Sequence, residues 1–130
     1  MFKGVSNGLK VKPMSVNQSY LGRKRKSFAY HAYEKYIMTQ IDAQPLPSKG
    51  LLQIDFVFGV STRSADLDNP IKPILDLLQK IHQFNDNRVY KLTAEKHIVA
   101  KGEEYLYYRI HSYVGEVNKK LEEVTNWHGL

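Results

Sequence analysis

The amino-acid sequence predicts a single α+β domain in which a mixed β-sheet carries two main helices on one face. The length of 130 residues suits one compact domain, so residues 1–130 are treated as one unit. Hydrophobic residues make up 42% and charged residues 25% of the chain, which is ordinary usage for a globular protein. Strand-like and helix-like hydrophobic patterns follow one another in the order β-α-β-α-β-β, and this order defines the predicted class.

The first part of the chain predicts a short strand and a helix. Residues 9–11 favour a brief strand, which Pro13 ends. A basic loop follows at residues 22–26. Ser27 is a typical N-cap for a helix that extends to about residue 42. Apolar side chains near helical spacing predict the buried face of this helix, namely Phe28, Ala32, Tyr36 and Ile37.

The middle of the chain predicts the central strand and the second helix. Residues 51–60 (LLQIDFVFGV) are rich in apolar and aromatic side chains and favour a buried or half-buried strand. After a polar connection, Pro70 and Pro73 must lie at the start of the next helix, and regular helix is expected from Pro73. The apolar face of this strongly amphipathic helix consists of Ile71, Ile74, Leu75, Leu78, Ile81 and Phe84.

The last part of the chain predicts two strands. Residues 85–87 (Asn-Asp-Asn) favour a turn. Residues 88–100 and 104–114 then predict two strands joined as a hairpin around Lys101 and Gly102. Residues 116–126 favour a last short helix.

Basic residues are concentrated in the first third of the chain. The net charge is +6, and residues 1–49 contain nine basic and two acidic side chains. This asymmetry suggests a polyanionic partner such as nucleic acid, a solubilising surface being the alternative. The absence of cysteine excludes disulfide scaffolds, thiolate zinc sites and cysteine nucleophiles. No stretch resembles a signal-peptide core or a membrane span, so we expect a cytoplasmic protein without a membrane partner.

Four of the six aspartates lie between residues 66 and 86. Asp66 and Asp68 leave the same face of an extended backbone, whereas Asp86 approaches them only if the strand after the helix runs back beside them. Converging carboxylates repel one another until a cation binds, and oxygen-only ligands select a hard ion. We therefore predict a Mg²⁺ site, for which Mn²⁺ is a substitute. Lys72 is placed beside it, to contact a phosphate oxygen or the attacking water.

Ordinary structural roles are the alternative for these residues. Asp68 or Asn69 suits a helix N-cap, and Asp86 suits an Asx-turn. Asp76 lies one helical turn after Lys72, and we interpret the two as an ordinary i, i+4 ion pair.

A combination of motifs resembles the RusA family of Holliday-junction resolvases. Its first parts are the block 66–72 (Asp-Leu-Asp-Asn-Pro-Ile-Lys) and Asp76. The turn and strand start at 85–89 (Asn-Asp-Asn-Arg-Val) and the later Lys96 complete it. The opening Pro13-x-Ser15-x-Asn17-x-x-Tyr20 is also similar to the amino-terminal segment of the family. The likeness covers roughly residues 10–112, and residues 115–130 lie outside it.

The resemblance implies a small homodimeric endonuclease of bacteria and their phages or prophages. Such enzymes nick four-way DNA junctions symmetrically on two strands with Mg²⁺ and no small-molecule cofactor, in DNA recombination and repair. The likeness assigns Asp66, Asp68 and Asp86 as the metal-binding catalytic carboxylates. It assigns Lys72 as the catalytic cation and Lys96 as a lysine that contacts DNA. The chain departs from relatives at residues 85–86, where they can have two acids, and at 62–65, where they can be strongly basic.

The predicted DNA-binding residues of the basic loop are Arg23, Lys24, Arg25 and Lys26. Tyr20, Phe28 or Tyr30 is available to stack on unpaired bases, with a core position favoured for Phe28. A two-fold dimer presents two identical sites, which suits paired incisions. The main alternative is a non-catalytic module that retains the fold and binds branched nucleic acid. Another Mg²⁺-dependent phosphoryl-transfer enzyme is a third class.

Overall fold

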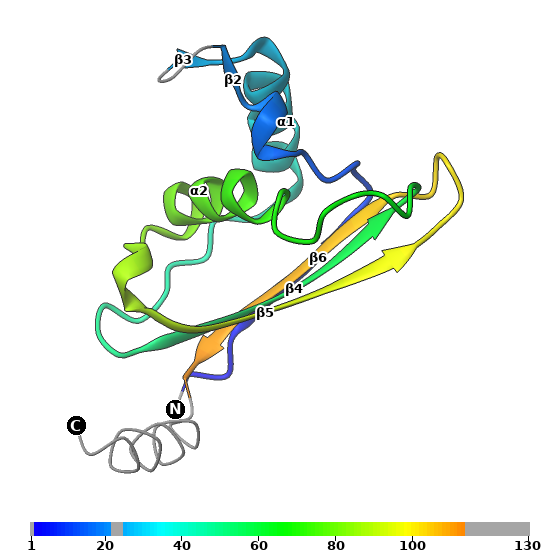
Figure 1. Ribbon diagram of the computed structural model, residues 1–130. Coiled ribbons are helices and arrows are strands. Elements are labelled where there is room, and N and C mark those ends of the chain that lie inside the picture. Colours follow the sequence, from blue (N-terminus) through cyan, green and yellow to red (C-terminus); the bar gives the residue numbers. More distant parts are fainter. Residues whose placement is uncertain (1, 22–24, 114–130) are drawn as a thin grey trace, which may run out of the picture.

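The structure is a computed structural model that describes residues 2–21 and 25–113. A four-stranded mixed sheet carries both helices on one face (Figure 1). The main elements are β1 (Val5–Leu9), α1 (Phe28–Gln40), β4 (Leu52–Val60), α2 (Ile71–His82), β5 (Val89–Ile98) and β6 (Tyr105–Ser112). The smaller ones are β2 (Tyr20–Leu21), β3 (Arg25–Lys26) and two 3₁₀ turns, η1 (Val16–Gln18) and η2 (Asp86–Arg88). The predicted α+β domain with a mixed sheet and two helices is confirmed.

The strand order of the sheet is β1-β6-β4-β5. β5 is parallel to β4, and β6 is antiparallel to both β4 and β1. The predicted hairpin between the last two strands is therefore wrong, because β4 lies between them. The α2 crossover places β5 on one side of β4, which leaves the other side of β4 for β6. The connection passes the end of β4, where the Val99 N–H donates to the Val60 carbonyl (2.8 Å).

β4 lies inside the sheet, and its side chains point alternately toward the helices and toward the uncovered face of the sheet. Ile54, Phe56 and Phe58 are buried against the helices, whereas Gln53 and Asp55 lie on the open face. The same core receives Leu106, Tyr108 and Ile110 from β6, Ile74, Leu77 and Leu78 from α2, and Tyr30, Tyr33 and Ile37 from α1. The predicted strand and its half-buried character are confirmed.

On the open face, the Asp55 carboxylate joins three strands. It accepts hydrogen bonds from Gln53, from Thr93 on β5 (2.7 Å), and from Arg109 and His111 on β6 (both 2.9 Å). Burial by itself raises the pKa of Asp55, but these hydrogen bonds outweigh it and hold the pKa well below its usual range. Asp55 is thus ionised and fastens β5 to β6 across β4.

α2 matches its predicted amphipathic face but begins earlier than predicted. It starts at Ile71 rather than Pro73, because a proline within the first turn removes only an N–H that has no intrahelical partner there. Ile74, Leu78 and Ile81 are buried as expected. Within the described residues, no helix is both long and apolar enough to cross a membrane.

α1 is capped as predicted but turns a different face to the core. The Ser27 hydroxyl accepts from the Tyr30 N–H (3.1 Å). Phe28, expected in the core, is 88% exposed, and Tyr36 is 39% exposed. Ala32 is exposed as well, and of the predicted face only Ile37 is buried, together with Tyr30 and Tyr33. Apolar and aromatic residues surround this helix on several sides, so periodicity alone does not select its buried face.

Three further segments differ from the prediction or lie outside the described residues. The first strand is Val5–Leu9 rather than 9–11, and it pairs with β6 while burying only Val5 and Leu9. Its glycine and polar residues give no strand pattern, so the pairing depends on β6 alone. Part of the basic loop forms the short β2–β3 pair, which was not predicted. The helix predicted at 116–126 lies outside the described residues.

A buried hydrogen-bond network joins α2 to β6 and β1. His82 Nδ1 lies 2.8 Å from the Gln44 carbonyl, and His82 Nε2 lies 2.8 Å from the Tyr108 hydroxyl. Asn7 Nδ2 donates to the same hydroxyl (2.8 Å). Because a carbonyl only accepts, Nδ1 carries the proton, and the Tyr108 hydroxyl donates to Nε2. Burial lowers the pKa of His82, so the folded state holds this ring neutral.

This network makes stability depend on pH in a defined direction. The folded pKa of His82 is lower than the unfolded value of about 6.5, so the unfolded chain binds more protons and stability falls as pH drops below about 6.5. His82→Gln is expected to be less stable at neutral pH and to lose less stability on acidification. Denaturant unfolding at several pH values checks this, with exposed His31→Gln as control. Equal pH slopes for His82→Gln and the wild-type protein would contradict it.

Candidate active site

The loop between β4 and α2 carries two exposed carboxylates. Asp66 and Asp68 lie beyond the carboxyl end of β4 and just before the first turn of α2, the end at which sheets with parallel strands commonly bind ligands. Asn69 Nδ2 donates to Asp66 Oδ2 at a long 3.4 Å. The Asp68 carboxylate makes no hydrogen bond or ion pair with any described residue. The backbone carbonyl of Asp68 accepts a hydrogen bond from the Ile71 N–H.

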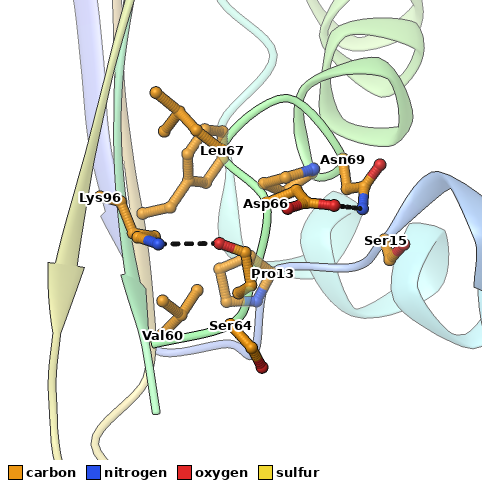
Figure 2. Close-up of a pocket in the computed structure, with 11 residues that line it drawn as sticks. Pro13, Ser15, Val60, Ser64, Asp66, Leu67, Asn69 and Lys96 are labelled. Carbon is orange, nitrogen blue, oxygen red and sulfur yellow. Dashed lines mark hydrogen bonds between the residues drawn. The ribbon is translucent and has the colours of Figure 1, made fainter. Parts of the chain in front are cut away.

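This loop is fixed from two sides. Lys96 Nζ donates to the carbonyls of Arg63 (3.1 Å) and Ala65 (2.8 Å), so an ammonium from β5 holds the loop backbone. Figure 2 shows the second of these bonds as a dashed line from Lys96. From the other side, the Val16 N–H donates to the Asn69 carbonyl (2.9 Å). The two anchors flank Asp66 and Asp68 in the sequence, so the carboxylates are held on a fixed backbone.

A cavity of about 230 Å³ lies beneath the loop. Phe58 and Val60 contribute apolar surface, and Ser15, Asp66 and Lys96 contribute polar groups (Figure 2). The cavity lies at the carboxyl ends of β4 and β5. Asp66 and Lys96 therefore line the same cavity.

Lys72 lies in the first turn of α2, four residues after Asp68. Its Nζ contacts both Asp76 oxygens, at 3.1 and 3.3 Å, which confirms the predicted i, i+4 pair. The hydrogen bond to Asp76 is the largest of the influences that raise the pKa of Lys72, so the ammonium stays charged. Its side chain is 60% exposed, which leaves it accessible to an anion.

The basic loop is tied to the same aspartate. Lys26 Nζ lies 4.2 Å from the ring centres of Tyr20 and Tyr30 and 3.6 Å from Asp76 Oδ2. These contacts use Lys26 to anchor the β2–β3 pair on α2 rather than leave it free for phosphates. Arg25 is exposed, whereas the predicted Arg23 and Lys24 lie outside the described residues.

Asp86 is separated from the other two acids within the chain. It lies in η2, beyond the far end of α2, and a helix of 12 residues is about 18 Å long. Val89, which follows η2, pairs with Leu52 at the start of β4, whereas Asp66 follows its end. No group of three or more His, Cys, Asp or Glu side chains able to hold a metal occurs in the described residues. One chain therefore places Asp66 and Asp68 on one loop and Asp86 past the other end of α2, while Lys72 lies in the first turn of the helix and is paired with Asp76.

The structural alternatives for the acids find little support. The N-cap of α2 is Pro70, with no side-chain capping bond, so neither Asp68 nor Asn69 caps the helix. The Asx-turn is made by Asn85, whose side chain accepts from the Asn87 N–H (3.0 Å). Among the described residues, the Asp86 carboxylate has no hydrogen bond or ion pair, although its charge acts on Lys72 at longer range.

A scan of protein-family models finds no match to this chain, and a search of curated proteins likewise finds none. The assignment of a reaction thus depends on the sequence motifs and on the site geometry.

The family resemblance implies a DNA contact for Lys96, and the sequence analysis missed its contact with the loop. A signal was present: Leu92, Ala94 and Ile98 follow the period of a strand face, and Lys96 interrupts it. That position faces the helices and lies opposite Phe58, within reach of the loop carbonyls. Two N–H groups of Lys96 donate to the loop, and the third has no acceptor among the residues that the structure describes.

Lys96→Met is therefore expected to loosen the loop. Hydrogen exchange of the loop amides should accelerate at least about ten-fold because two charge-assisted hydrogen bonds are lost, each worth about 1.5–3 kcal/mol. Exchange measured by mass spectrometry checks this, with Lys91→Met, a half-buried lysine on the same strand, as control. Unchanged exchange, together with a salt slope for DNA binding reduced by about 1, would instead assign Lys96 to phosphate contact.

Proposed function

We propose that this protein is a Mg²⁺-dependent, structure-specific endodeoxyribonuclease that resolves four-way DNA junctions by paired symmetric nicks, as a homodimer. The observation that carries the proposal is the pair Asp66 and Asp68, exposed on an anchored loop that leads into the first turn of α2, where Lys72 lies. Neither carboxylate caps α2, and Asp68 has no side-chain partner among the described residues. The motif resemblance supplies the substrate, and it implies a cytoplasmic site of action in a bacterium, with a chromosomal or phage gene.

The donor set of the loop suits Mg²⁺. This ion is commonly bound by one or two carboxylates, with waters and substrate phosphate oxygens completing its shell. Asp66 and Asp68 would hold it; Mn²⁺ takes the same oxygen ligands. When bound, the ion supplies charge neutralisation at the scissile phosphate and activation of a water. Because Asp86 of the same chain lies beyond the far end of α2, only a second copy can add this carboxylate.

The remaining residues bind and position the DNA. Lys72 carries a permanent positive charge to a non-bridging phosphate oxygen, and its pair with Asp76 limits the positions that its side chain adopts. Lys96 keeps the loop in place. Arg25, with Arg23 and Lys24, contacts the phosphates of the junction arms, while Lys26 holds the β2–β3 pair against α2.

The second candidate is a module that binds branched nucleic acid without cutting it. The separation of Asp86 from Asp66 and Asp68 favours it, since two carboxylates make a weaker metal site than three. In this candidate the basic residues still bind the phosphates of the nucleic acid, and no metal ion is needed. It predicts junction binding that is insensitive to EDTA and is not followed by cleavage.

The test uses the full-length protein, a labelled four-way junction and a matched linear duplex, each with Mg²⁺ or EDTA. The proposal expects two symmetric nicks in the junction with Mg²⁺, none with EDTA and none in the duplex. Tight junction binding without nicks in either buffer would support the binding module. Neither binding nor cleavage would reject both candidates.

A further inference from the structure

Phe28 is an apolar side chain that stands almost entirely in solvent. It is 88% exposed, and the next most exposed large apolar or aromatic residue in the described part of the chain, Tyr90, is 61% exposed. A phenyl ring left in water forgoes the free energy that its burial provides. Phe28 is the first residue of α1, and Figure 1 shows the β2–β3 pair beside this end of the helix.

The backbone that carries Phe28 is held firmly. Ser27, the residue before it, is buried. The Ser27 N–H donates to the Ser19 carbonyl (2.8 Å), and the Ser27 hydroxyl donates to the Gln18 carbonyl (2.5 Å). The same hydroxyl accepts from the Tyr30 N–H (3.1 Å). The ring therefore projects from a fixed point, and only its two side-chain torsions remain to be ordered when a ligand covers it.

The same hydrogen bonds connect Phe28 to the loop of the candidate site. The Val16 N–H donates to the carbonyl of Asn69, the residue after Asp68 (2.9 Å). Val16 begins η1, which leads to Ser19 and so to the residue before Phe28. Along this path the Cα atoms of Asp68 and Phe28 are at most about 25 Å apart. Because DNA spans this distance with about seven base steps, one DNA molecule is long enough to contact both residues.

Of the three aromatic residues that the sequence makes available for stacking on bases, the structure leaves Phe28 uncovered. Tyr30 is buried. Lys26 Nζ lies 4.2 Å from the ring centres of Tyr20 and Tyr30, and it donates to the Tyr20 hydroxyl (2.9 Å). In the described part of the chain, Phe28 has no ring or cation contact of this kind. Its two ring faces are therefore the ones that a base can reach.

The residues next to Phe28 favour a polyanion as the ligand. Residues 23–26 are all basic and end two positions before Phe28. Arg25 is exposed among the described residues. An aromatic ring that stacks on bases, next to basic side chains that bind phosphates, is the combination with which proteins bind unpaired nucleotides. A single base is flat and similar in size to a phenyl ring, so it covers Phe28 without a wide apolar patch around it.

We propose that Phe28 stacks on a base at the branch point of a four-way DNA junction and thereby contributes to selectivity for junctions over linear duplex. This inference rests on the proposed function. In a linear duplex each base stacks on both sides, so a protein ring enters only at the cost of unstacking two neighbours. At a branch point the stacking is interrupted, and a base face is available at a lower cost. Phe28 therefore adds to the affinity for the junction and little to the affinity for the duplex.

The test measures binding of the full-length protein to a labelled four-way junction and to a matched duplex by fluorescence anisotropy in EDTA, where no strand is cut. Phe28→Ala should raise the junction Kd at least about five-fold and the duplex Kd less than about two-fold. Phe28→Trp keeps an aromatic ring and should retain the wild-type junction Kd. Phe28→Leu keeps an apolar side chain without a ring and should resemble Phe28→Ala.

Met38→Ala is the matched control, because Met38 lies on the same helix and is 49% exposed. It should change neither Kd. Since Phe28 makes little contact with the rest of the protein, Phe28→Ala should also keep the wild-type circular dichroism spectrum and denaturant midpoint. The change in junction Kd then reports a lost contact with DNA rather than a change in the fold.

A second measurement follows the base itself. 2-Aminopurine beside the branch point should brighten when the wild-type protein draws it away from its neighbours, and it should brighten less with Phe28→Ala. The same probe in the middle of an arm should stay unchanged with both proteins.

The outcomes separate this inference from the proposed function. Equal junction Kd values and equal probe signals for Phe28→Ala and the wild-type protein would overturn the inference, while Mg²⁺-dependent nicking of the junction would still support the proposed function. A duplex Kd that rises as much as the junction Kd would also overturn the inference. The expected loss of junction affinity in Phe28→Ala, with no nicks by the wild-type protein in Mg²⁺, would reject the nuclease and retain the stacking role. A wild-type protein that binds neither DNA would overturn both.

Discussion

Asp68→Asn is expected to abolish Mg²⁺-dependent cleavage of a four-way junction while leaving the fold intact. The change keeps the size of the side chain and removes one of two candidate metal ligands on the loop. Loss of the ion forfeits several kcal/mol of transition-state stabilisation, so the rate should fall about 1,000-fold or more. Because the Asp68 carboxylate has no side-chain partner among the described residues, the free energy of unfolding should change by less than about 0.5 kcal/mol.

Asp42→Asn is the matched control for this variant. Asp42 is an exposed aspartate after α1, and it should tolerate the change in both cleavage and stability. Single-turnover cleavage, denaturant unfolding and junction binding are measured for both variants. A clear loss of stability in Asp68→Asn would return Asp68 to a structural role, and full cleavage by Asp68→Asn would remove it from the metal site.

Lys72→Gln is expected to lower the cleavage rate about 100-fold, because the charge that meets the scissile phosphate is lost. Junction affinity should change little, since one phosphate contact alters the salt slope by about 1 at most. The pair with Asp76 is exposed, so its loss should cost only about 0.3–0.5 kcal/mol of stability. Rates at saturating protein, together with binding as a function of salt, separate these effects.

Lys80→Gln is the control for Lys72→Gln. Lys80 lies on the same helix, is equally exposed and is paired with Glu34 (2.9 Å), but it is two turns farther from Asp68. It should therefore show the same small loss of stability with an unchanged cleavage rate. If both variants lose the same activity, Lys72 contributes only general positive charge, and the assigned role is wrong.

Local patterns were sufficient where one element buries one clear face. The spacing of Ile74, Leu78 and Ile81 predicts α2 and its core side, because a 3.6-residue period has a single solution there. The short run of apolar and aromatic side chains along 51–60 likewise predicts β4. Periodicity failed for α1, where Phe28 and Tyr36 compete with Tyr30 and Tyr33 for the core and only packing against α2 and the sheet decides between them.

The pairing of strands that are distant in the sequence could not be predicted from local patterns. β1 forms a strand because β6 lies beside it, and Asn7 reaches Tyr108, a residue 101 positions away. The last two strands look like a hairpin because a short turn joins them. They are separated by β4, because the α2 crossover had already placed β5 on its other side. Such choices depend on the whole sheet rather than on the residues at the turn.

Local sequence patterns predict α2, β4 and the chemical types of the candidate site: the acids, the lysine after Asp68 and the basic loop. Tertiary structure alone decided which of them meet. It separates Asp86 from Asp66 by the length of α2, turns Lys96 onto the loop backbone and engages Lys26 with Asp76. The physical reason is that spacing along the chain controls distances only within an element. Distances between elements follow from helix length, strand order and the side of the sheet that each side chain faces.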